Sequence, residues 1–450
     1  MKQQNTQYFA GLVRQLTELS NKSITLPCLR AAVHVVFRLG TEKRSPKTSR
    51  SLILTRNLKT AYDSSIIKLI HYWSENVKPI MLIHRVLMLF VLAASFVSCG
   101  ARNAASSTTE TRIVTDVWGR EVRIPLEVKT IAALGSGAPR IAAYLGVMDM
   151  LSGGERSDAE NFTVLRDYNP VHHAALRELP VLGSGGGSGN NNAFPEELIK
   201  AAPDVILAAF SAEAADELFS QTNIPVVCVR YFSVNFIDDT FYRAVKVFAE
   251  VTNTQKRGEE VLAFINAHKV ELNQRTRNRT QNISVAERLR VYAGAVTFNG
   301  RQGFFGTYSN FGPLMGINAR NVADETGMEG FFEANPEQVI MWNPDIIFLD
   351  PGNIDLVHSE YATNPTFFNS LKAVREKRTY TMPAFNYAGT NVTYALINAY
   401  FAGTVLFPDE FADIDIAEKA REILLFLLGT NTFETMAHNG LYYGQISIGE

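Results

Sequence analysis

The feature that most constrains the fold of this 450-residue chain is a thirteen-residue segment that occurs twice. The segment PEELIKAAPDVIL (195–207) is nearly repeated as PEQVIMWNPDIIF (336–348), 141 positions further along. In each copy the opening proline and glutamate suit the first turn of a helix. A second proline then ends the helix, and the aspartate after it leads into an apolar run typical of a buried parallel strand. The repeat therefore predicts two α/β units of similar construction.

Short apolar runs alternate with helical segments on both sides of one long, strongly charged segment, 254–278. Such alternation is typical of parallel α/β sheets. A β-hairpin is predicted at 112–125 and the first helix at 139–145. Buried strands are predicted at 130–134, 205–210, 225–230 and 346–350. At 1.5 Å per residue the charged segment would form a helix roughly 35 Å long. We therefore predict an α/β protein of two parallel-sheet, Rossmann-like lobes, joined by a single long helix, with a ligand cleft between them.

Length and composition agree with a globular chain of more than one folded unit, since 46% of the residues are hydrophobic and 20% are charged. Residues 1–80 carry 13 Lys and Arg against 4 Asp and Glu, which leaves 30 against 41 for the remainder. An acidic body argues against nucleic acid as a partner.

The sequence divides into six predicted parts. They are a basic leader (1–80), a signal peptide (81–98), a flexible tether (99–111), a first α/β lobe (112–237), a helical linker with the long helix (238–280) and a second α/β lobe (286–450).

An export signal is predicted from Met81 onward. A cationic start at His84 and Arg85 precedes an apolar run and small residues before Cys99, the order found in secretory signals. The run falls short of the roughly 20 apolar residues that a membrane-spanning helix needs, which disfavours that alternative. The segment resembles a bacterial lipoprotein signal, which implies lipidation at Cys99 and attachment to a membrane through a lipid anchor.

A signal peptide does not act from the interior of a chain, so the basic leader needs an explanation. We hypothesise that synthesis starts at Met81 and that residues 1–80 are not part of the native protein. The alternative is a genuine cytoplasmic N-terminal domain, but no long periodic segment supports one. Any peptide from residues 1–80 in mass spectra of the native protein would contradict the hypothesis.

Enzymatic and metal-binding motifs are weak in this sequence. GSGGGSG (183–189) matches neither the GxxxxGK[ST] nor the GxGxxG phosphate-binding pattern, and no GxSxG or HExxH motif occurs. The three cysteines form no CxxC pair, and direct capture of a metal ion would need several convergent ligands, of which the adjacent His172 and His173 are the best candidates. An α/β enzyme acting on a small polar substrate, a direct metal-ion binding protein and a merely adhesive surface lipoprotein remain as alternatives.

Several motifs in order carry a resemblance to a known family. The opening TDVWGREVRIP, the loop GSGAPRIAAYLG, the lipoprotein signal and the paired Glu-x6-Pro-Asp helices resemble the solute-binding proteins of ABC importers for iron-siderophore, haem and corrinoid chelates, over residues 111–430. The resemblance implies a periplasmic, non-catalytic protein that captures an iron chelate (siderophore, haem or corrinoid) and delivers it to an ABC permease with its ATPase. It also implies that Glu196 and Glu337 dock onto arginines of the permease, although a first-turn glutamate is also ordinary helix chemistry.

Ligand contacts are expected in the loops that follow the predicted strands, because ligands gather beyond the carboxyl ends of parallel strands. These loops are rich in aromatic and amide side chains, which suit a bulky chelate. Arg140 or Arg301 would neutralise a carboxylate of the ligand, although each aromatic taken singly is also consistent with loop packing. The expected contacts are Arg140, Tyr231, Phe298, Arg301, Phe304, Tyr308, Phe385, Asn386 and Tyr387. Chain length and the single connecting helix favour a monomer with modest lobe motion.

Overall fold

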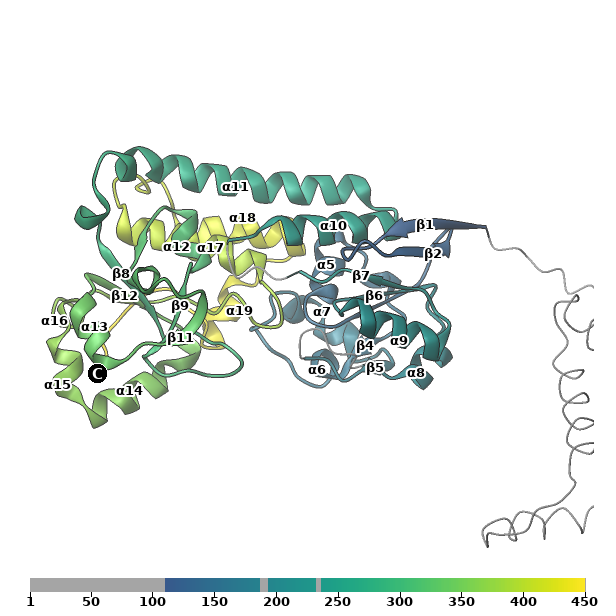
Figure 1. Ribbon diagram of the computed structural model, residues 1–450, viewed down its shortest axis with the longest axis horizontal. Helices are drawn as coiled ribbons and strands as arrows, with labels where there is room; N and C mark the ends of the chain where they lie inside the picture. Colours follow the sequence, from purple (N-terminus) through teal and green to yellow (C-terminus); the bar gives the residue numbers. More distant parts are fainter. Residues whose placement is uncertain (1–109, 187–192, 232–235, 450) are drawn as a thin grey trace, which may run out of the picture. The chain divides into compact units, whose positions relative to one another are not determined.

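The computed structural model describes residues 110–186, 193–231 and 236–449, which belong to one compact unit, Ser107–Glu450 (Figure 1). The predictions made for the basic leader, the signal peptide and the lipidated Cys99 lie outside the described residues, as does most of the glycine-rich loop at 183–192. Within the described ranges, no helix is both long enough and apolar enough to span a membrane.

The first lobe is built on a parallel three-stranded sheet in the order β3-β6-β7. A predicted hairpin, β1 with β2, precedes it, and the short parallel pair β4 and β5 lies beside it. The strands are β1 (Thr111–Thr115), β2 (Glu121–Pro125), β3 (Ile131–Leu134), β4 (Gly154–Glu155), β5 (Val181–Gly183), β6 (Val205–Ala208) and β7 (Val226–Cys228). The central strands are fully buried, which is why their sequences are continuous apolar runs.

Six helices surround this sheet (Figure 1). They are α5 (Ala138–Leu145), α6 (Arg156–Ala159), α7 (Asn169–Leu176), α8 (Pro195–Ala201), α9 (Ala212–Thr222) and α10 (Asp239–Thr252). Helix α5 begins at Gly137, whose φ of 97° lies in the left-handed region. A Cβ at Gly137 would lie 2.6 Å from the ring of Tyr231, so both the backbone angle and the close packing require glycine there.

The second lobe contains a five-stranded sheet in the order β10-β8-β12-β13-β14, parallel except for its last strand. A separate antiparallel pair, β9 and β11, packs beside β8. The strands are β8 (Arg290–Gly294), β9 (Gly306–Ser309), β10 (Arg320–Asn321), β11 (Gly330–Glu333), β12 (Ile346–Leu349), β13 (Thr379–Thr381) and β14 (Gln445–Ile446). The helices are α12 (Gly312–Gly316), α13 (Pro336–Trp342), α14 (Ile354–Thr363), α15 (Pro365–Ser370), α16 (Lys372–Arg375), α17 (Val392–Leu406), α18 (Ile416–Leu428) and α19 (Phe433–His438).

The long charged segment forms α11 (Gln255–Gln281), a helix of 27 residues that links the lobes as predicted. Figure 1 shows α11 running along the molecule, with α17 and α18 beside it. It is not the only connection, because α18 of the second lobe packs on α5 of the first. The guanidinium of Arg257 on α11 donates to the carbonyls of both Tyr144 in α5 (3.0 Å) and Phe426 in α18 (2.5 Å).

The two copies of the repeat form α8 and α13, each seven residues long and each begun by proline. Each helix ends on a residue in the left-handed region, Ala202 (φ 47°) or Asn343 (φ 40°). In each copy the side chain of the aspartate that follows accepts hydrogen bonds from backbone amides at or just before the start of the neighbouring strand. Asp204 accepts from the amides of Lys129 (2.7 Å) and Thr130 (2.9 Å), and Asp345 accepts from the amide of Arg290 (2.9 Å). The Pro-Asp corner is thus used twice because it joins a short helix to a parallel sheet.

Candidate functional site

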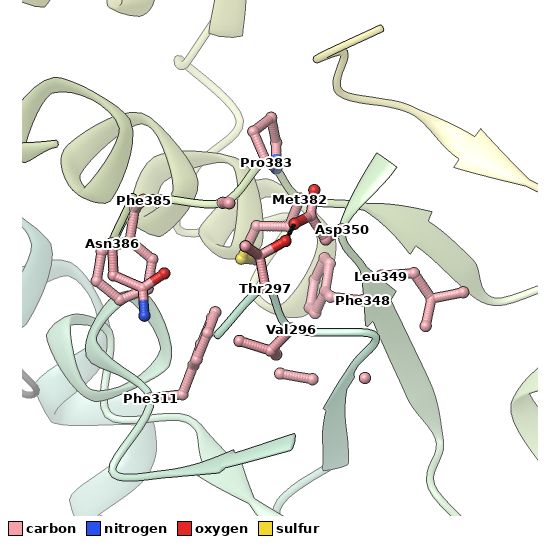
Figure 2. Close-up of a pocket in the computed structure, with 13 residues that line it drawn as sticks. Val296, Thr297, Phe311, Phe348, Leu349, Asp350, Met382, Pro383, Phe385 and Asn386 are labelled. Carbon is pink, nitrogen blue, oxygen red and sulfur yellow. Dashed lines mark hydrogen bonds between the residues drawn. The ribbon is translucent and has the colours of Figure 1, made fainter. Parts of the chain in front are cut away.

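A pocket lies where the parallel strands β8, β12 and β13 of the second lobe end (Figure 2). It holds about 270 Å³ of empty space, open solvent included. Its walls are mostly apolar, and Phe311 meets Phe385 edge to face with ring centroids 5.3 Å apart. The loop from Met382 to Asn386 closes one side. This is the position at which an open parallel sheet binds its ligand.

Polar side chains in the pocket are few, and two of them are hydrogen-bonded to each other. The hydroxyl of Thr297 donates to the buried carboxylate of Asp350 (2.5 Å), as the dashed line in Figure 2 shows. Burial raises the pKa of Asp350, although hydrogen bonds from Thr297 and from the amide of Gly352 oppose the rise. The amide side chain of Asn386 is half-buried at the same pocket. The pocket therefore offers apolar surface with an amide and a carboxyl group.

Aromatic side chains continue from this pocket along the loop after β8. Phe298 stacks on Phe331 of β11 with centroids 4.7 Å apart, and Tyr308 of β9 lies edge-on to Phe298 at 6.2 Å. Phe298 and Phe331 remain half-buried, whereas Tyr308 is buried. Phe298 directly follows Thr297 of the pocket wall, so this aromatic face, a partly exposed pair of stacked rings, begins one residue away from the pocket.

Arg140 lies elsewhere, and its guanidinium has no donor left for a ligand. The side chain is fully buried on α5, and its five N–H groups have five acceptors. The acceptors are Asp167 Oδ1 (2.7 Å), Tyr231 Oη (3.1 Å), the carbonyls of Ala388 (2.9 Å) and Tyr387 (3.3 Å), and Asn391 Oδ1 (2.6 Å). The prediction that Arg140 neutralises a ligand carboxylate is not supported by this arrangement, because Asp167 already neutralises it. A buried guanidinium with a carboxylate and full hydrogen bonding is a structural group.

The other predicted ligand contacts lie in the pocket, in the aromatic face, beside Arg140 or elsewhere in the second lobe. Phe385 and Asn386 line the pocket, Phe298 and Tyr308 form the aromatic face, and Tyr231 and Tyr387 lie with Arg140. Arg301 is exposed and pairs with Asp355. Phe304 is completely buried among Tyr292, Phe367 and Phe368, so a ligand contact there would require the core of the second lobe to open.

Sequence reasoning did not single out Thr297, Phe311, Asp350 or Asp167. Asp350 directly follows a buried strand, which is a usable signal for a group at the ligand-binding edge of a sheet. Asp167 gives no such signal, because nothing in its neighbourhood shows that Arg140, 27 residues earlier, will lie against it. Among the residues that the structure describes, no group of three or more His, Cys, Asp and Glu side chains is arranged to hold a metal ion.

The two predicted docking glutamates are exposed on α8 and α13. The repeat also exposes an aliphatic side chain three residues after each of them. Ile199 is 53% exposed and Ile340 is 48% exposed, at equivalent places in the two copies. Residues three apart are neighbours on a helix surface, so each copy presents a carboxylate beside an aliphatic group.

The described chain thus has two α/β lobes joined by a long helix, with a pocket at the strand ends of one lobe. The family model described as "periplasmic binding protein" matches residues 142–385, and the chain belongs to that family. The resemblance stated from the sequence is thereby confirmed at the level of the family, whose members bind solutes and are not enzymes.

Similar proteins agree with this assignment. The chain is 23% identical over 350 residues to the molybdate-binding protein MolA of Haemophilus influenzae. That alignment covers 72% of this chain and 93% of MolA. A periplasmic solute-binding protein from Veillonella parvula gives a TM-score of 0.58 at 17% identity, covering 74% and 97% of the two chains. The solved structure of MolA with molybdate gives 0.54 at 21% identity, covering 71% and 98%. At these identities the likeness to the solved structures shows the fold.

Proposed function

We propose that this chain is the solute-binding component of an ABC importer, which captures an iron chelate (a siderophore complex, haem or a corrinoid) and delivers it to a membrane permease with its ATPase. The observation that carries the ligand class is the half-buried stack of Phe298 on Phe331, next to a largely apolar pocket. Flat aromatic surface with a few polar groups suits the ring systems of chelates better than a bare ion.

An oxyanion such as molybdate is the second candidate. The pocket is nearly filled by its own side chains, because the space in it that is open to water-sized molecules is about 10 Å³, roughly the room for one water. The relative from Haemophilus influenzae is named as molybdate-binding and is aligned over 72% of this chain. A small anion would need the pocket to widen less than a chelate would, whereas the aromatic face favours the chelate.

Calorimetric titration of the purified protein separates these candidates. Haemin, cyanocobalamin, a ferric catecholate complex and sodium molybdate would each be titrated under the same conditions. We expect saturable one-site binding of one chelate, with the ligand recovered chemically unchanged. Saturable binding of molybdate alone would favour the second candidate, and consumption of any of these compounds would contradict a binding protein.

Docking to the permease is proposed for Glu196 and Glu337. Two like charges, one on each lobe, would set the register of the protein on its partner, and rim charges act mainly on association rate and orientation. Charge reversal at both positions (E196K with E337K) is expected to abolish uptake by cells while ligand affinity of the purified protein is unchanged.

A matched control is available within the chain. Glu197 is exposed beside Glu196, but the second copy has Gln338 in its place, so this carboxylate is not common to both lobes. The double variant E197K with E376K makes the same change in net charge at exposed positions and is expected to transport normally. Normal uptake by E196K with E337K would remove the docking role.

Export and lipid anchoring through Cys99 complete the proposal. Mass spectrometry of the protein from membranes of its native host is expected to show an N-terminus at a lipid-modified Cys99. An unmodified N-terminus upstream of Met81 would contradict both the lipid anchor and the proposed start of synthesis.

A further inference from the structure

The segment that closes the pocket continues directly into the contact between the lobes. Met382 to Asn386 line the pocket, and Tyr387, Ala388 and Asn391 follow them as acceptors for Arg140 of the first lobe. The backbone here approaches α5 closely, since a Cβ at Gly389 would lie 3.2 Å from Arg140 Nη1 and 3.4 Å from Cα of Gly137. The position of the pocket wall therefore depends on groups that belong to the other lobe.

The carboxylate of Asp167 is the centre of this contact. Its Oδ1 accepts from Arg140 Nε (2.7 Å) and from the amide of Tyr168 (3.1 Å). Its Oδ2 accepts from the hydroxyl of Tyr144 and from the hydroxyl of Thr393 on α17 (2.8 Å). Both members of the ion pair are 0% exposed. The carboxylate thus joins α5 of the first lobe to α17 of the second.

Asn391 closes the network from the second lobe. Its side-chain oxygen accepts from Arg140 Nη2 (2.6 Å) and from the amide of Asp167 (3.0 Å), and its side-chain NH₂ donates to the carbonyl of Leu165 (3.1 Å). The hydroxyl of Tyr394 donates to the carbonyl of Val164 (2.7 Å). Because these groups are buried and mutually satisfied, separating the lobes here would leave several of them without partners.

We propose that Arg140, Asp167, Asn391 and Thr393 form an interlobe clamp, whose members are positioning residues that hold the pocket wall 382–386 at a fixed distance from the first lobe. The proposal rests on the proposed function for its effect on ligand binding, but the clamp itself is a property of the protein without ligand. The clamp connects the lobes in addition to α11 and to the packing of α18 on α5, and it limits how far the cleft opens when a solute enters or leaves.

Hydrogen exchange of the full chain tests the clamp without any ligand. The amide of Asp167 donates across the lobes to Asn391, so its exchange reports opening at this point. Thr393→Val removes the hydroxyl that donates to Asp167 and keeps the side chain's shape, whereas Thr393→Ser keeps the hydroxyl. We expect exchange in a peptide covering 164–168 to be roughly tenfold faster in T393V, as for loss of one charge-assisted hydrogen bond, and to return to the wild-type rate in T393S.

The strands at the centre of each sheet supply the internal control. Peptides covering β6 and β12 are expected to exchange at the wild-type rate in both variants, because the clamp lies outside the sheets. No acceleration at 164–168 in T393V would overturn the proposal. So would equal acceleration in β6 and β12, which would indicate general destabilisation, or failure of T393S to restore the rate.

The effect on solute binding is measured by stopped-flow with haemin and sodium molybdate as probes. For a probe that the wild type binds, T393V is expected to raise the dissociation rate several-fold and T393S is expected to leave it unchanged. An unchanged rate in T393V would overturn the positioning role. If the wild type binds neither these probes nor the other compounds of the titration, the proposed function fails, while the exchange result still decides whether the clamp exists.

Discussion

At the scale of single residues, Glu155 is a carboxyl group that the fold removes from water. It is 4% exposed at the end of β4, and its Oε1 accepts from the amide of Gly135 (2.6 Å). Burial raises the pKa of Glu155 to about 7, with Asp158 adding to the rise while the Gly135 amide and Arg166 oppose it. The folded protein therefore holds a proton at Glu155 at pH values where an unfolded chain does not.

This shift makes stability depend on pH in a definite direction. A raised pKa in the folded state contributes stability that is fully present below about pH 4.5 and is lost as the pH rises through about 7. Glu155→Gln keeps a carbonyl oxygen for the Gly135 amide but does not titrate. The free energy of unfolding should therefore change less between pH 5 and pH 8 in E155Q, by up to about 3 kcal/mol.

Urea unfolding at both pH values measures this difference, with the exposed Glu178→Gln as the control. The control is expected to follow the wild type at both pH values. Identical pH dependence in E155Q and wild type would show that Glu155 does not titrate in this range.

At the scale of elements, the two Pro-Asp corners have the same backbone arrangement, but their aspartates differ in the number of charged partners. Asp204 accepts from backbone amides and the Thr130 hydroxyl, whereas Asp345 also pairs with the side chains of Arg290 (3.2 Å) and Lys372 (2.8 Å). Burial alone would raise the pKa of Asp345, but the hydrogen bonds from Arg290 and Lys372 outweigh it and hold that pKa well below its usual range. The stability of the second corner therefore depends on the negative charge of Asp345.

Asp345→Asn is expected to lower the free energy of unfolding by about 1.5–3 kcal/mol at pH 7, because hydrogen bonds to charged groups are lost. Asp204→Asn should lower it by only about 1 kcal/mol. Since a depressed pKa contributes stability that is lost as the pH falls below the ordinary value of 3.8, the deficit of D345N should shrink in acid. Urea unfolding between pH 7 and pH 3 tests this, and equal deficits for both variants would contradict it.

The exposed isoleucines of the repeat predict an apolar component of docking. Replacing both Ile199 and Ile340 by serine is expected to change stability by no more than about 0.5 kcal/mol, because both are half exposed. Cellular uptake should nevertheless fall, while ligand affinity stays the same. Serine at the similarly exposed Phe219 and Val285, outside the repeat, is the control, and an equal fall in uptake there would contradict a specific role.

For the molecule as a whole, one of the three buried hydrophobic clusters of the described residues extends through both lobes. The largest buried cluster includes Ile131 and Val205 of the first sheet, Val261 of α11, and Val291 and Leu396 of the second lobe. A core that continues from lobe to lobe opposes independent unfolding. We therefore expect the denaturant transitions followed by circular dichroism and by tryptophan fluorescence to coincide, whereas two separate transitions would show that the lobes unfold independently.

Local signals in the sequence predicted many of the elements, but not the short strands β4, β9, β10 and β11. Prolines, first-turn glutamates and buried apolar runs act over a few residues, so the hairpin, the paired helices α8 and α13, the central parallel strands and the long helix α11 were predictable. The strand predicted at 205–210 is shorter in the structure, Val205–Ala208, because the apolar residues after it lie in a buried loop.

The surroundings of the candidate site residues depend on long-range contacts, which local signals do not show. Arg140 was expected to neutralise a carboxylate of the ligand, whereas in the structure it pairs with Asp167 and donates to Asn391, 251 residues away. Phe304, expected at the ligand, fills the core of the second lobe. The surroundings of both side chains depend on which distant segments come together on folding. Residue type and local spacing do not show those contacts, because long-range packing overrides local preference.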